Sequence, residues 1–317
     1  MKKKVCNSGI GGQAVLEGVM MKNKEAYAIA VRKQDGEIDL EITEYHGVMH
    51  GSVLTKVPFI RGVFNFIDSF ILGMRSINHS ADLFGVTDDP ETGFDRFMKK
   101  VFKDKAEKVT SGLTVMLSVI LALGLFIFLP YYLSSILERY IMNSSLLALV
   151  EGLIRLVIFL LYLLAISLLK DIRRLFMYHG AEHKCINCIE HGNELTVENV
   201  KKASRLHKRC GTSFLLFVMV ISIILFMFIK VDNPALRIVF RLLLIPVIAG
   251  ISYEVIKLAG RSDNIIVNIL SAPGLALQFI TTKEPDESMI EVAIKSVEGV
   301  IDWHEYVDCV RNNTFEV

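Results

Sequence analysis

Long apolar segments separated by charged connectors dominate the pattern of this chain. Each of the four longest contains at most two charged residues; they are Gly112–Leu133, Leu153–Leu169, Gly211–Ile229 and Leu236–Tyr253. A helix needs about 20 apolar residues to cross the roughly 30 Å hydrocarbon core of a bilayer. The pattern therefore predicts four transmembrane helices, and a composition of 52% hydrophobic residues fits a membrane protein.

The pattern before the first apolar segment alternates with a period of two. Glu25–Tyr45 consists of two alternating β-prone stretches around Asp35-Gly36, which predicts a β-hairpin. The glycine-rich stretch before it, GIGGQAVLEGVMM, lacks the Lys-Ser/Thr of a phosphate-binding loop and leads into a strand. We interpret it as a tight backbone turn.

Three further segments are helical by pattern. Val57–Gly85 is apolar nearly all round, which fits an interfacial or partly inserted helix and fits a buried helix of a soluble region equally well. Pro273-Gly274 splits Ser262–Thr282 into two pieces too short to span, so we expect an interfacial or re-entrant segment there. Ser288-x-x-Glu291 is a capping box and starts an amphipathic C-terminal helix.

These elements predict a mainly α membrane protein with a small N-terminal α+β region. Residues 1–110 form a cytoplasmic region with the hairpin and an interfacial helix. Residues 111–258 form the four-helix transmembrane domain, including a cytoplasmic loop over 170–210, and residues 259–317 form a cytoplasmic C-terminal region.

The placement of basic residues sets the predicted orientation. Lysine and arginine are concentrated before the first span and in the 170–210 loop, and the other two connectors are poor in them. The positive-inside rule puts both termini and that loop in the cytoplasm of a bacterial cell. The opening MKKK has no apolar segment behind it, so no cleaved signal peptide is expected.

Charge also narrows the function classes. The net charge of +1 gives no sign of a nucleic-acid partner, so the bilayer is the first expected partner. Glu151 and Arg155 lie four residues apart and are expected to pair with each other. Few other ionisable residues fall within the spans, which disfavours a channel or a transporter.

Cysteine usage favours metal binding over disulfides. Three of the five cysteines, Cys185, Cys188 and Cys210, lie in or beside the 170–210 loop, in a reducing compartment on the predicted topology.

The stretch YHGAEHKCINC carries the first candidate chemistry. His179 and His183 are four residues apart, so on a helix they share a face and can hold one metal ion. With Glu182 they form H-x-x-E-H, the inverted zincin order, in which the histidines hold zinc and the glutamate is the general base.

A rival pattern interleaves with the first. Cys185-x2-Cys188, followed by His207-x2-Cys210, has the spacing of a closed four-ligand structural zinc site. In a third interpretation the loop holds no metal: the histidines form ordinary hydrogen bonds and the cysteines are small apolar fillers.

An inverted-zincin site needs a third ligand, and two candidates remain open. Glu254 is an ionisable residue at the cytoplasmic end of the fourth span, although it can instead pair with Lys257 or Arg261. A straight continuation of the second span would carry His179 about 15 Å past the membrane edge, away from Glu254. His207 and Cys210 lie nearer to Glu254 in depth.

The chain resembles the YqhQ-like family of bacterial membrane proteins. The motifs that carry the resemblance are IGGQAVLEGVMM, YHGAEHKCINC, HKRCGTSF, GISYEVIKLAGR and TTKEPDESMIEVAI. The resemblance implies a multi-pass membrane protein with a domain of unknown function, described as a predicted metal-dependent enzyme. It gives weight to a site made of His179, Glu182, His183, His207, Cys210 and Glu254, and it implies variation at positions 185 and 188.

Two functions are therefore expected. The first is a zinc-dependent hydrolase, with a peptidase as one form, in which His179 and His183 bind the metal, Glu182 is the base, and Glu254 or His207 completes the shell. The second is a non-enzymatic accessory factor that binds other membrane proteins or their biogenesis machinery, with a structural metal or none. An open coordination position favours the first; a closed Cys/His shell favours the second.

Overall fold

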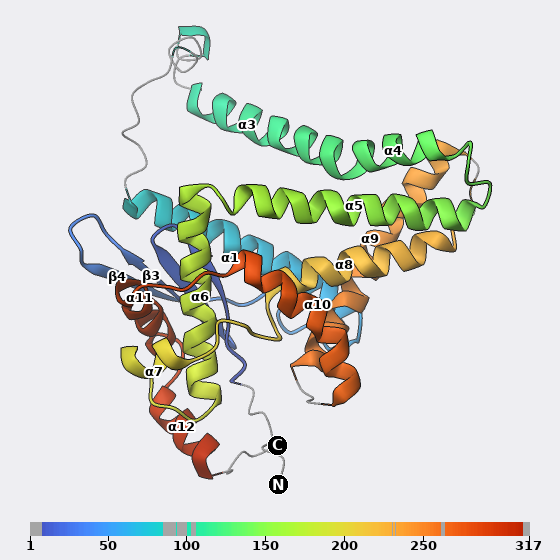
Figure 1. The fold of residues 1–317 in the computed structure, drawn as a ribbon. Coiled ribbons are helices and arrows are strands. Elements are labelled where there is room, and N and C mark those ends of the chain that lie inside the picture. The colour runs from blue at the N-terminus through green and yellow to red at the C-terminus, as the bar shows by residue number, and fades with distance from the viewer. Residues whose placement is uncertain are drawn as a thin grey trace. The chain divides into compact units, whose positions relative to one another are not determined.

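The computed structural model describes residues 8–84, 93, 100–102, 106–229, 231, 233–260 and 264–312. In this part of the chain the protein is mainly helical, with one small antiparallel sheet near the N-terminus (Figure 1). Contacts group the chain into two compact units. The first contains Met1–Phe84, Leu163–Ile221 and Pro234–Val317, and the second contains Gly85–Tyr162 and Ser222–Asn233. The division into 1–110, 111–258 and 259–317 follows the expected spans and stays a prediction.

The sheet has four strands in the order β1-β2-β3-β4. They are β1 (Gly11–Val15), β2 (Gly18–Asn23), β3 (Ala26–Arg32) and β4 (Ile38–Glu44). The predicted hairpin is confirmed, because β3 pairs with β4 up to Arg32 and Ile38, with Gly36 at a φ of +89° in the turn. The glycine-rich stretch is not the tight turn that was predicted: Gly11 and Gly12 begin β1, and the turn lies between β1 and β2 at Leu16 and Glu17. Strand β2 was not predicted.

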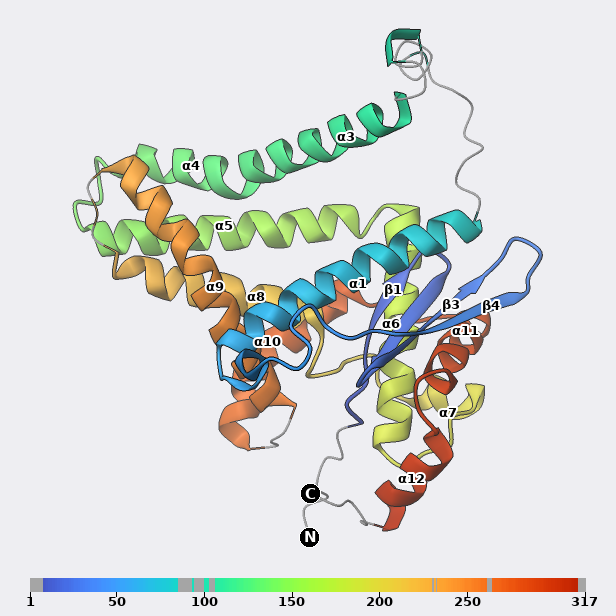
Figure 2. The same ribbon diagram turned by 180° about the vertical axis from the view of Figure 1, so that it is seen from behind.

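Helices cover both faces of the sheet, as Figures 1 and 2 show from opposite sides. Val19 and Met21 project from one face into a core shared with α6 (Lys170–Glu190) and α11 (Glu287–Glu298). Met20 and Ile29 project from the other face and pack with Leu72 of α1 (Ile60–Phe84). Alternate residues of a strand point to opposite faces, so both faces are apolar here and the sheet is buried on both sides.

Helix α1 is the segment predicted over Val57–Gly85. It begins at Ile60, after the short 3₁₀ helix η1 (Val53–Lys56). One side packs on the sheet, while Phe66 and Phe70 on the other side are exposed. The helix thus combines a buried face with an apolar exposed one, and insertion of that exposed face into a membrane interface stays a prediction.

Two details of the C-terminal region correct the sequence analysis. Helix α10 (Ile265–Thr281) runs unbroken through Pro273, where two pieces were predicted. A proline removes one helical hydrogen bond, but the bonds on either side can hold the helix together. Helix α11 is capped by Asp286, which accepts a hydrogen bond from the Met289 N–H, and not by Ser288. The predicted apolar face of α11 is confirmed, since Met289, Val292 and Val297 are fully buried.

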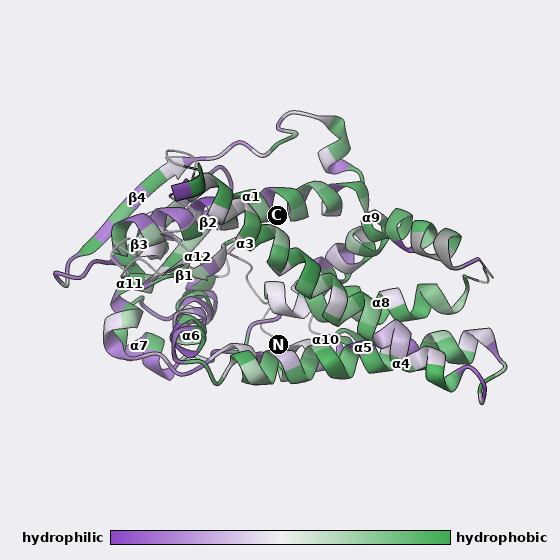
Figure 3. Cartoon of the chain, turned by 90° about the horizontal axis from the view of Figure 1, so that it is seen from above, coloured by the Kyte–Doolittle hydropathy of each residue, from purple (hydrophilic) through white to green (hydrophobic). Residues whose placement is uncertain are grey.

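Three helical segments of the described chain are long and apolar enough to cross a membrane: Gly112–Leu137, Ser144–Ile166 and Val239–Ala259. The first joins α3 (Ala106–Leu123), a π-helical turn η4 (Gly124–Phe128) and α4 (Leu129–Leu137); the others lie in α5 (Ser144–Ile166) and α9 (Pro234–Ala259). The remaining candidate, α8 (Gly211–Met227), is apolar but has 17 residues. Figure 3 shows the hydrophobic character of α5 and α8. Three of the four predicted spans therefore correspond to helices that are long and apolar enough to cross a membrane.

The predicted pair within the second unit is confirmed. An Arg155 Nη2 group lies 2.8 Å from a Glu151 carboxylate oxygen, and Arg155 Nε donates to the Phe126 carbonyl at 3.0 Å. Both charges are satisfied internally, so this arginine links α5 to η4.

Candidate metal centre

Helix α6 presents both motif histidines on one face. The extended backbone of Leu169 (φ −70°, ψ 134°) separates α6 from α5, so the two are not one straight helix. The helix has two stripes. Tyr178, Ala181, Cys185, Cys188 and Ile189 belong to the core, whereas His179, Glu182 and His183 border a cavity of about 810 Å³. Helical periodicity thus sorts the motif residues into two environments.

Each histidine is oriented by a backbone carbonyl. The distance from His179 Nδ1 to the Thr281 oxygen is 2.8 Å, and from His183 Nδ1 to the Arg205 oxygen 2.6 Å. A carbonyl only accepts hydrogen bonds, so each Nδ1 carries the proton and each Nε2 faces inward as the ligand atom. The ring centroids are 4.4 Å apart. Such outer hydrogen bonds are typical of metal-binding histidines.

Cys210 is the third member of the cluster. It lies directly before α8, and its Sγ is 3.2 Å from His179 Nε2 and 3.1 Å from Thr212 Oγ1. One ligand atom each of His179, His183 and Cys210 lie within 4.8 Å of one another. Two imidazoles and a thiolate therefore converge on one point from α6 and the start of α8.

The cysteine is electrostatically prepared to ionise. Burial opposes ionisation of the Cys210 thiol, but His179 and His183 outweigh it and hold its pKa well below the usual value. For His179, burial favours the neutral ring, yet Cys210 raises the pKa of the imidazole to about 9. Each group thus favours the charged form of the other, the thiolate of Cys210 and the imidazolium of His179. A divalent cation between them would take the place of the imidazolium proton.

Glu182 lies beside this cluster with part of its carboxylate unsatisfied. The residue is 4% exposed, and its buried Oε2 has no hydrogen-bond partner among the described residues. Burial raises the pKa of this carboxyl, against the charges of His179 and His183. A Cβ at Gly12 of β1 would stand 2.9 Å from the Glu182 side chain, so the glycine leaves the space that this carboxylate fills. A buried polar atom without a partner is costly, which makes this carboxylate oxygen a candidate for binding a ligand or a water molecule.

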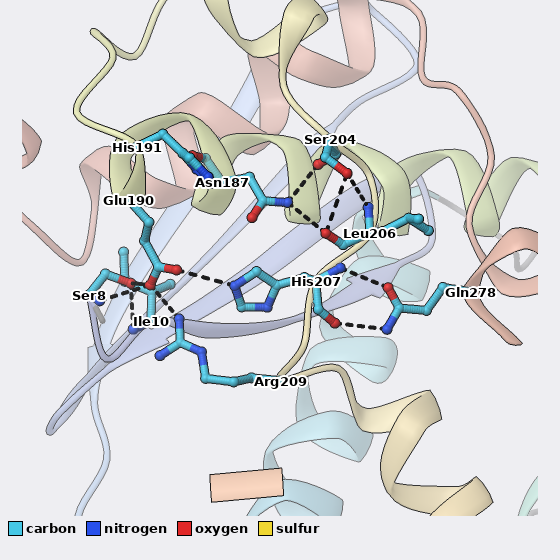
Figure 4. A network of polar contacts seen from close by, with 10 residues as sticks. All are labelled: Ser8, Ile10, Asn187, Glu190, His191, Ser204, Leu206, His207, Arg209 and Gln278. Atoms are coloured by element: carbon cyan, nitrogen blue, oxygen red, sulfur yellow. Dashed lines mark hydrogen bonds and ion pairs between the residues drawn. The ribbon is translucent and has the colours of Figure 1, made fainter. Parts of the chain in front are cut away.

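A buried carboxylate holds the loop that delivers Cys210 (Figure 4). Glu190, at the end of α6, accepts hydrogen bonds from Ser8 Oγ at 2.7 Å and the Ser8 N–H at 2.8 Å. It also contacts His207 Nε2 at 3.3 Å and pairs with Arg209. Burial disfavours the charged form of Glu190, but His207 and Arg209 prevail and lower its pKa to about 2. The sequence analysis did not single out Glu190, which has no motif around it.

Gln278 of α10 fixes the same loop from the other side. Its side-chain oxygen accepts the His207 N–H and its amide donates to the His207 carbonyl, both at 2.8 Å. The backbone of the loop preceding Cys210 is therefore held by side chains from α6 and α10. Gln278 was also missed, because nothing local in the sequence links it to a residue 71 positions away.

Two other predicted ligands are engaged elsewhere. The Glu254 carboxylate pairs with the Arg61 guanidinium, and one of its oxygens is 2.7 Å from Arg61 Nε. His207 lies near the cluster, with its ring 5.8 Å from that of His183, but its Nε2 is directed to Glu190. The structure therefore brings together His179, His183, Cys210 and Glu182, and leaves Glu254 in an ion pair.

The structure does not bring the four ligands of the predicted structural zinc site together. That site consists of Cys185, Cys188, His207 and Cys210. Cys185 and Cys188 are fully buried in the apolar core, and burial raises the pKa of both thiols, that of Cys188 to about 11. Cys188 Sγ lies 3.3 Å from the Glu194 carbonyl oxygen. These neutral thiols behave as small apolar residues, as the third interpretation of the loop expected for them.

Comparisons with known proteins agree on one family. The family described as "Protein of unknown function (DUF1385)" matches residues 57–303. The chain is 36% identical over 307 residues to the "Uncharacterized protein YqhQ" of Bacillus subtilis (strain 168), which covers 93% of this chain and 93% of that protein. No solved structure matches the chain. The resemblance read from the sequence motifs is confirmed.

Proposed function

Because the chain belongs to the DUF1385 family, whose function is unknown, we propose a function from the geometry of its site. The protein is a zinc-dependent hydrolase at the cytoplasmic face of a bacterial membrane. His179, His183 and Cys210 hold the metal and Glu182 is the general base. The observation that carries this proposal is the convergence of three ligand atoms beside a buried carboxylate oxygen without a partner.

The number of ligands favours catalysis over a structural role. Catalytic zinc sites have three protein ligands and an open position, whereas structural sites are closed by four. Of the other predicted ligands, Cys188 belongs to the apolar core, and His207 Nε2 is directed to Glu190. The cluster also borders the cavity of about 810 Å³, within the size range of ligand pockets. Substrate therefore has space beside the proposed metal.

The donor set favours zinc among the common metals. Imidazole nitrogen and thiolate sulfur suit zinc, while magnesium and calcium prefer oxygen ligands. The carbonyl contacts of the two Nδ1 atoms leave the Nε2 atoms for the metal, and the low pKa of Cys210 favours the thiolate form that metals require.

Each residue then has a defined task. His179, His183 and Cys210 would hold a zinc ion, which would supply a Lewis acid and lower the pKa of a water molecule bound to it. Glu182 Oε2, with no other hydrogen-bond partner among the described residues, accepts a proton from the attacking water. Burial raises the pKa of Glu182, which makes the carboxylate a better base. Gly12 keeps the space for this side chain.

The membrane arrangement is part of the proposal. Four spans with both termini in the cytoplasm place α6 and Cys210 at the cytoplasmic face. Three helices support this by length, and α8, at 1.5 Å per residue, would extend about 26 Å, close to the hydrocarbon thickness. The basic residues before α3 and around α6 support the orientation.

Glu182→Gln provides the test of the catalytic role. Glutamine preserves the shape of the side chain but cannot take up a proton, so the variant should keep zinc and fold while losing cellular function. The assay is complementation of a deletion strain, with zinc content and protein level measured in parallel. Full complementation by a normally expressed, zinc-containing variant would eliminate the hydrolase. Cys188→Ser is the matched control, since a structural zinc site would lose metal in that variant and the proposed site would not.

A further inference from the structure

One lysine in the wall of the cavity has no anionic partner. Lys22 of β2 is half-buried and borders the cavity that also reaches the candidate metal centre. Its Nζ lies 5.0 Å from the centroid of the Tyr45 ring, and it forms no ion pair or hydrogen bond with another described residue. Burying a charge without a counter-charge costs free energy, so this ammonium group is available to bind an anion.

Asp68 of α1 acts on Lys22 electrostatically but is hydrogen-bonded elsewhere. Its Oδ1 accepts the Tyr45 hydroxyl at 3.0 Å and the Val48 N–H at 2.8 Å. Asp68 raises the pKa of Lys22, but burial lowers it by more, so the pKa lies below its ordinary value. A bound anion would stabilise the charged form that burial disfavours.

The wall of the cavity carries more positive than negative charge. Glu182 is the one acidic residue that borders it in the described part of the chain, whereas Lys22, Lys24 and Arg209 all border it. Arg209 is paired with Glu190, and Lys24 is exposed to solvent. Lys22 is therefore the half-buried cation of this wall without a counter-charge, and an anionic ligand is favoured.

The cavity connects Lys22 to the metal centre around β1. Gly11 is the register partner of Lys22, and Gln13 is the partner of Met20. Paired residues share a face and alternate residues of a strand do so too, so all four lie on the face covered by α1. Gly12 lies between the two β1 positions and faces α6. The cavity borders all five residues, so it extends from the α1 face to the α6 face.

Gly11 keeps the space beside Lys22 open. A Cβ there would meet nothing within 4 Å, and its φ is not in the left-handed region, so neither packing nor backbone conformation requires a glycine. The Cβ atoms of register partners stand about 4.5–5.5 Å apart, so a side chain at Gly11 would stand in the cavity next to Lys22. A glycine inside a strand often marks a place where a ligand approaches closely.

Uncharged hydrogen-bond donors border the cavity on the same face as Lys22. Gln13 of β1 and Ser69 of α1 both border it. A Cβ on Gly73 of α1 would stand 2.5 Å from the Gln13 side-chain oxygen, so that glycine leaves room for the amide. Leu72 and Met20 add apolar wall beside them. An amide, a hydroxyl and an ammonium group together suit a carboxylate at the end of an apolar chain.

We propose that the substrate carries a carboxylate that binds Lys22 on the α1 face, joined by an apolar spacer to the bond that is hydrolysed at the metal centre. This rests on the proposed hydrolase function and names its substrate class. One half-buried lysine balances one negative charge, and Gln13 and Ser69 can donate to the remaining oxygen lone pairs. A doubly charged phosphate would keep one charge unbalanced.

The reaction is hydrolysis of one ester or amide bond in that substrate. The water oxygen bonds to the carbonyl carbon, the C–O or C–N bond breaks, and the products are a carboxylic acid and an alcohol or amine. Glu182 takes one proton from the water and returns it to the leaving oxygen or nitrogen. No oxidant or reductant takes part.

The first test measures binding without turnover, on the zinc-loaded Glu182→Gln protein. The probes are the unbranched dicarboxylates from malonate to suberate and the monocarboxylates of the same chain lengths, titrated by calorimetry in detergent. One dicarboxylate should bind about tenfold tighter than its monocarboxylate, because a hydrogen bond between charged groups is worth about that factor. A series in which no dicarboxylate binds tighter than its monocarboxylate would overturn the proposal.

Lys22→Met, made in the same Glu182→Gln background, should abolish that preference. Methionine has a similar length but no charge. Zinc content should not change, because the proposed ligands lie outside β2, and the thermal midpoint should not fall, because burial disfavours the charge of Lys22. Lys24→Met is the matched control, since Lys24 borders the same cavity but is exposed. A preference that persists in Lys22→Met, or disappears in Lys24→Met alone, contradicts the assignment.

Gly11→Val tests the space between Lys22 and the metal centre. The open surroundings of the added atoms and the preference of valine for strands predict a normal fold and normal zinc content. Monocarboxylate binding should persist, while the preferred dicarboxylate should lose its advantage. Gly211→Ala, which also borders the cavity and has open space, should keep the advantage. Unchanged dicarboxylate binding in Gly11→Val would contradict a ligand that extends past Gly11.

A pair of 4-nitrophenyl esters separates this proposal from the hydrolase itself. One is the half-ester of the preferred dicarboxylate and the other is the ester of its monocarboxylate. Zinc-loaded wild type should cleave the charged ester with about tenfold higher kcat/KM, and Lys22→Met should cleave both alike. Equal cleavage by wild type, without a preferred dicarboxylate, would overturn the carboxylate site and leave the hydrolase. Dicarboxylate binding that depends on Lys22, with no cleavage of either ester, would support the carboxylate site and overturn hydrolysis.

Discussion

The side-chain amide of Gln278 pairs with both backbone groups of His207, accepting its N–H and donating to its carbonyl at 2.8 Å each. Gln278 is fully buried, so this contact replaces the water that the loop backbone would otherwise bind. It joins α10 to the loop that ends at Cys210. The position of Cys210, the third proposed ligand, therefore depends on Gln278, which is neither a proposed ligand nor the proposed base.

Gln278→Leu should loosen this loop. Leucine has a similar size but leaves a buried N–H and a buried carbonyl of His207 unpaired, at a cost of roughly 1–3 kcal/mol each. We expect a lower thermal unfolding midpoint in detergent and a reduced zinc content. Asn268→Leu is the control on the same helix, because Asn268 is exposed and its contact with Lys208 lies at the surface. A Gln278→Leu protein as stable as the Asn268→Leu protein would contradict this account.

Zinc content tests the ligand cluster directly. We expect about one zinc per chain, lost when His179 and His183 are both changed to alanine, since two of the three ligands are then missing. His46 and His50 form the matched control. They lie near Glu25 in another group of potential ligand atoms, but all three are exposed. Elemental analysis of the His46→Ala/His50→Ala protein should match wild type; zinc lost from that variant alone would move the site to the surface.

The local elements were predictable because their signals are local. The hairpin over Glu25–Tyr45 follows from alternation around one turn, and the apolar face of α11 follows from helical spacing. Strand β2 was missed because it is apolar on both faces, so its residues do not alternate. Helix α8 ends at Met227, although the apolar sequence continues, so hydropathy alone overstates the helix length.

The candidate site was predictable only in part. His179 and His183 share a helical face, and that follows from the sequence. Cys185 follows His183 by two residues, about 200° around a helix with 3.6 residues per turn, so it cannot face the same ion. Helical geometry thus separates the cysteines from the histidines once α6 is known to continue to Glu190. The ion pair of Glu254 with Arg61, and the contacts of Gln278, join distant parts of the chain and carry no local signal.

Glu190 predicts a specific pH dependence. Its pKa falls from the ordinary 4.5 to about 2 on folding, so the folded state holds the charged form more strongly than the unfolded chain does. This stability is fully present above about pH 4.5 and is lost as the pH falls towards 2, to a total of about 3 kcal/mol. Glu190→Gln should remove this part of the acid sensitivity. The measurement is the thermal midpoint of zinc-free wild type and variant between about pH 6 and pH 2.5; parallel curves for the two proteins would contradict the prediction.

Cysteine labelling tests the membrane arrangement, including the fourth span. Single cysteines at Met142, Glu198 and Asn233 all lie at exposed positions. In a Cys6→Ser/Cys309→Ser background, the remaining cysteines, Cys185, Cys188 and Cys210, are buried.

With both termini in the cytoplasm, a membrane-impermeant maleimide should label Met142→Cys in intact cells, and label Glu198→Cys only after permeabilisation. Asn233 lies between α8 and α9, so labelling of Asn233→Cys from outside shows that the 17 residues of α8 cross the bilayer. Labelling of Asn233→Cys only from inside would leave α8 on the cytoplasmic side, and labelling of Glu198→Cys in intact cells would move the candidate site out of the cytoplasm.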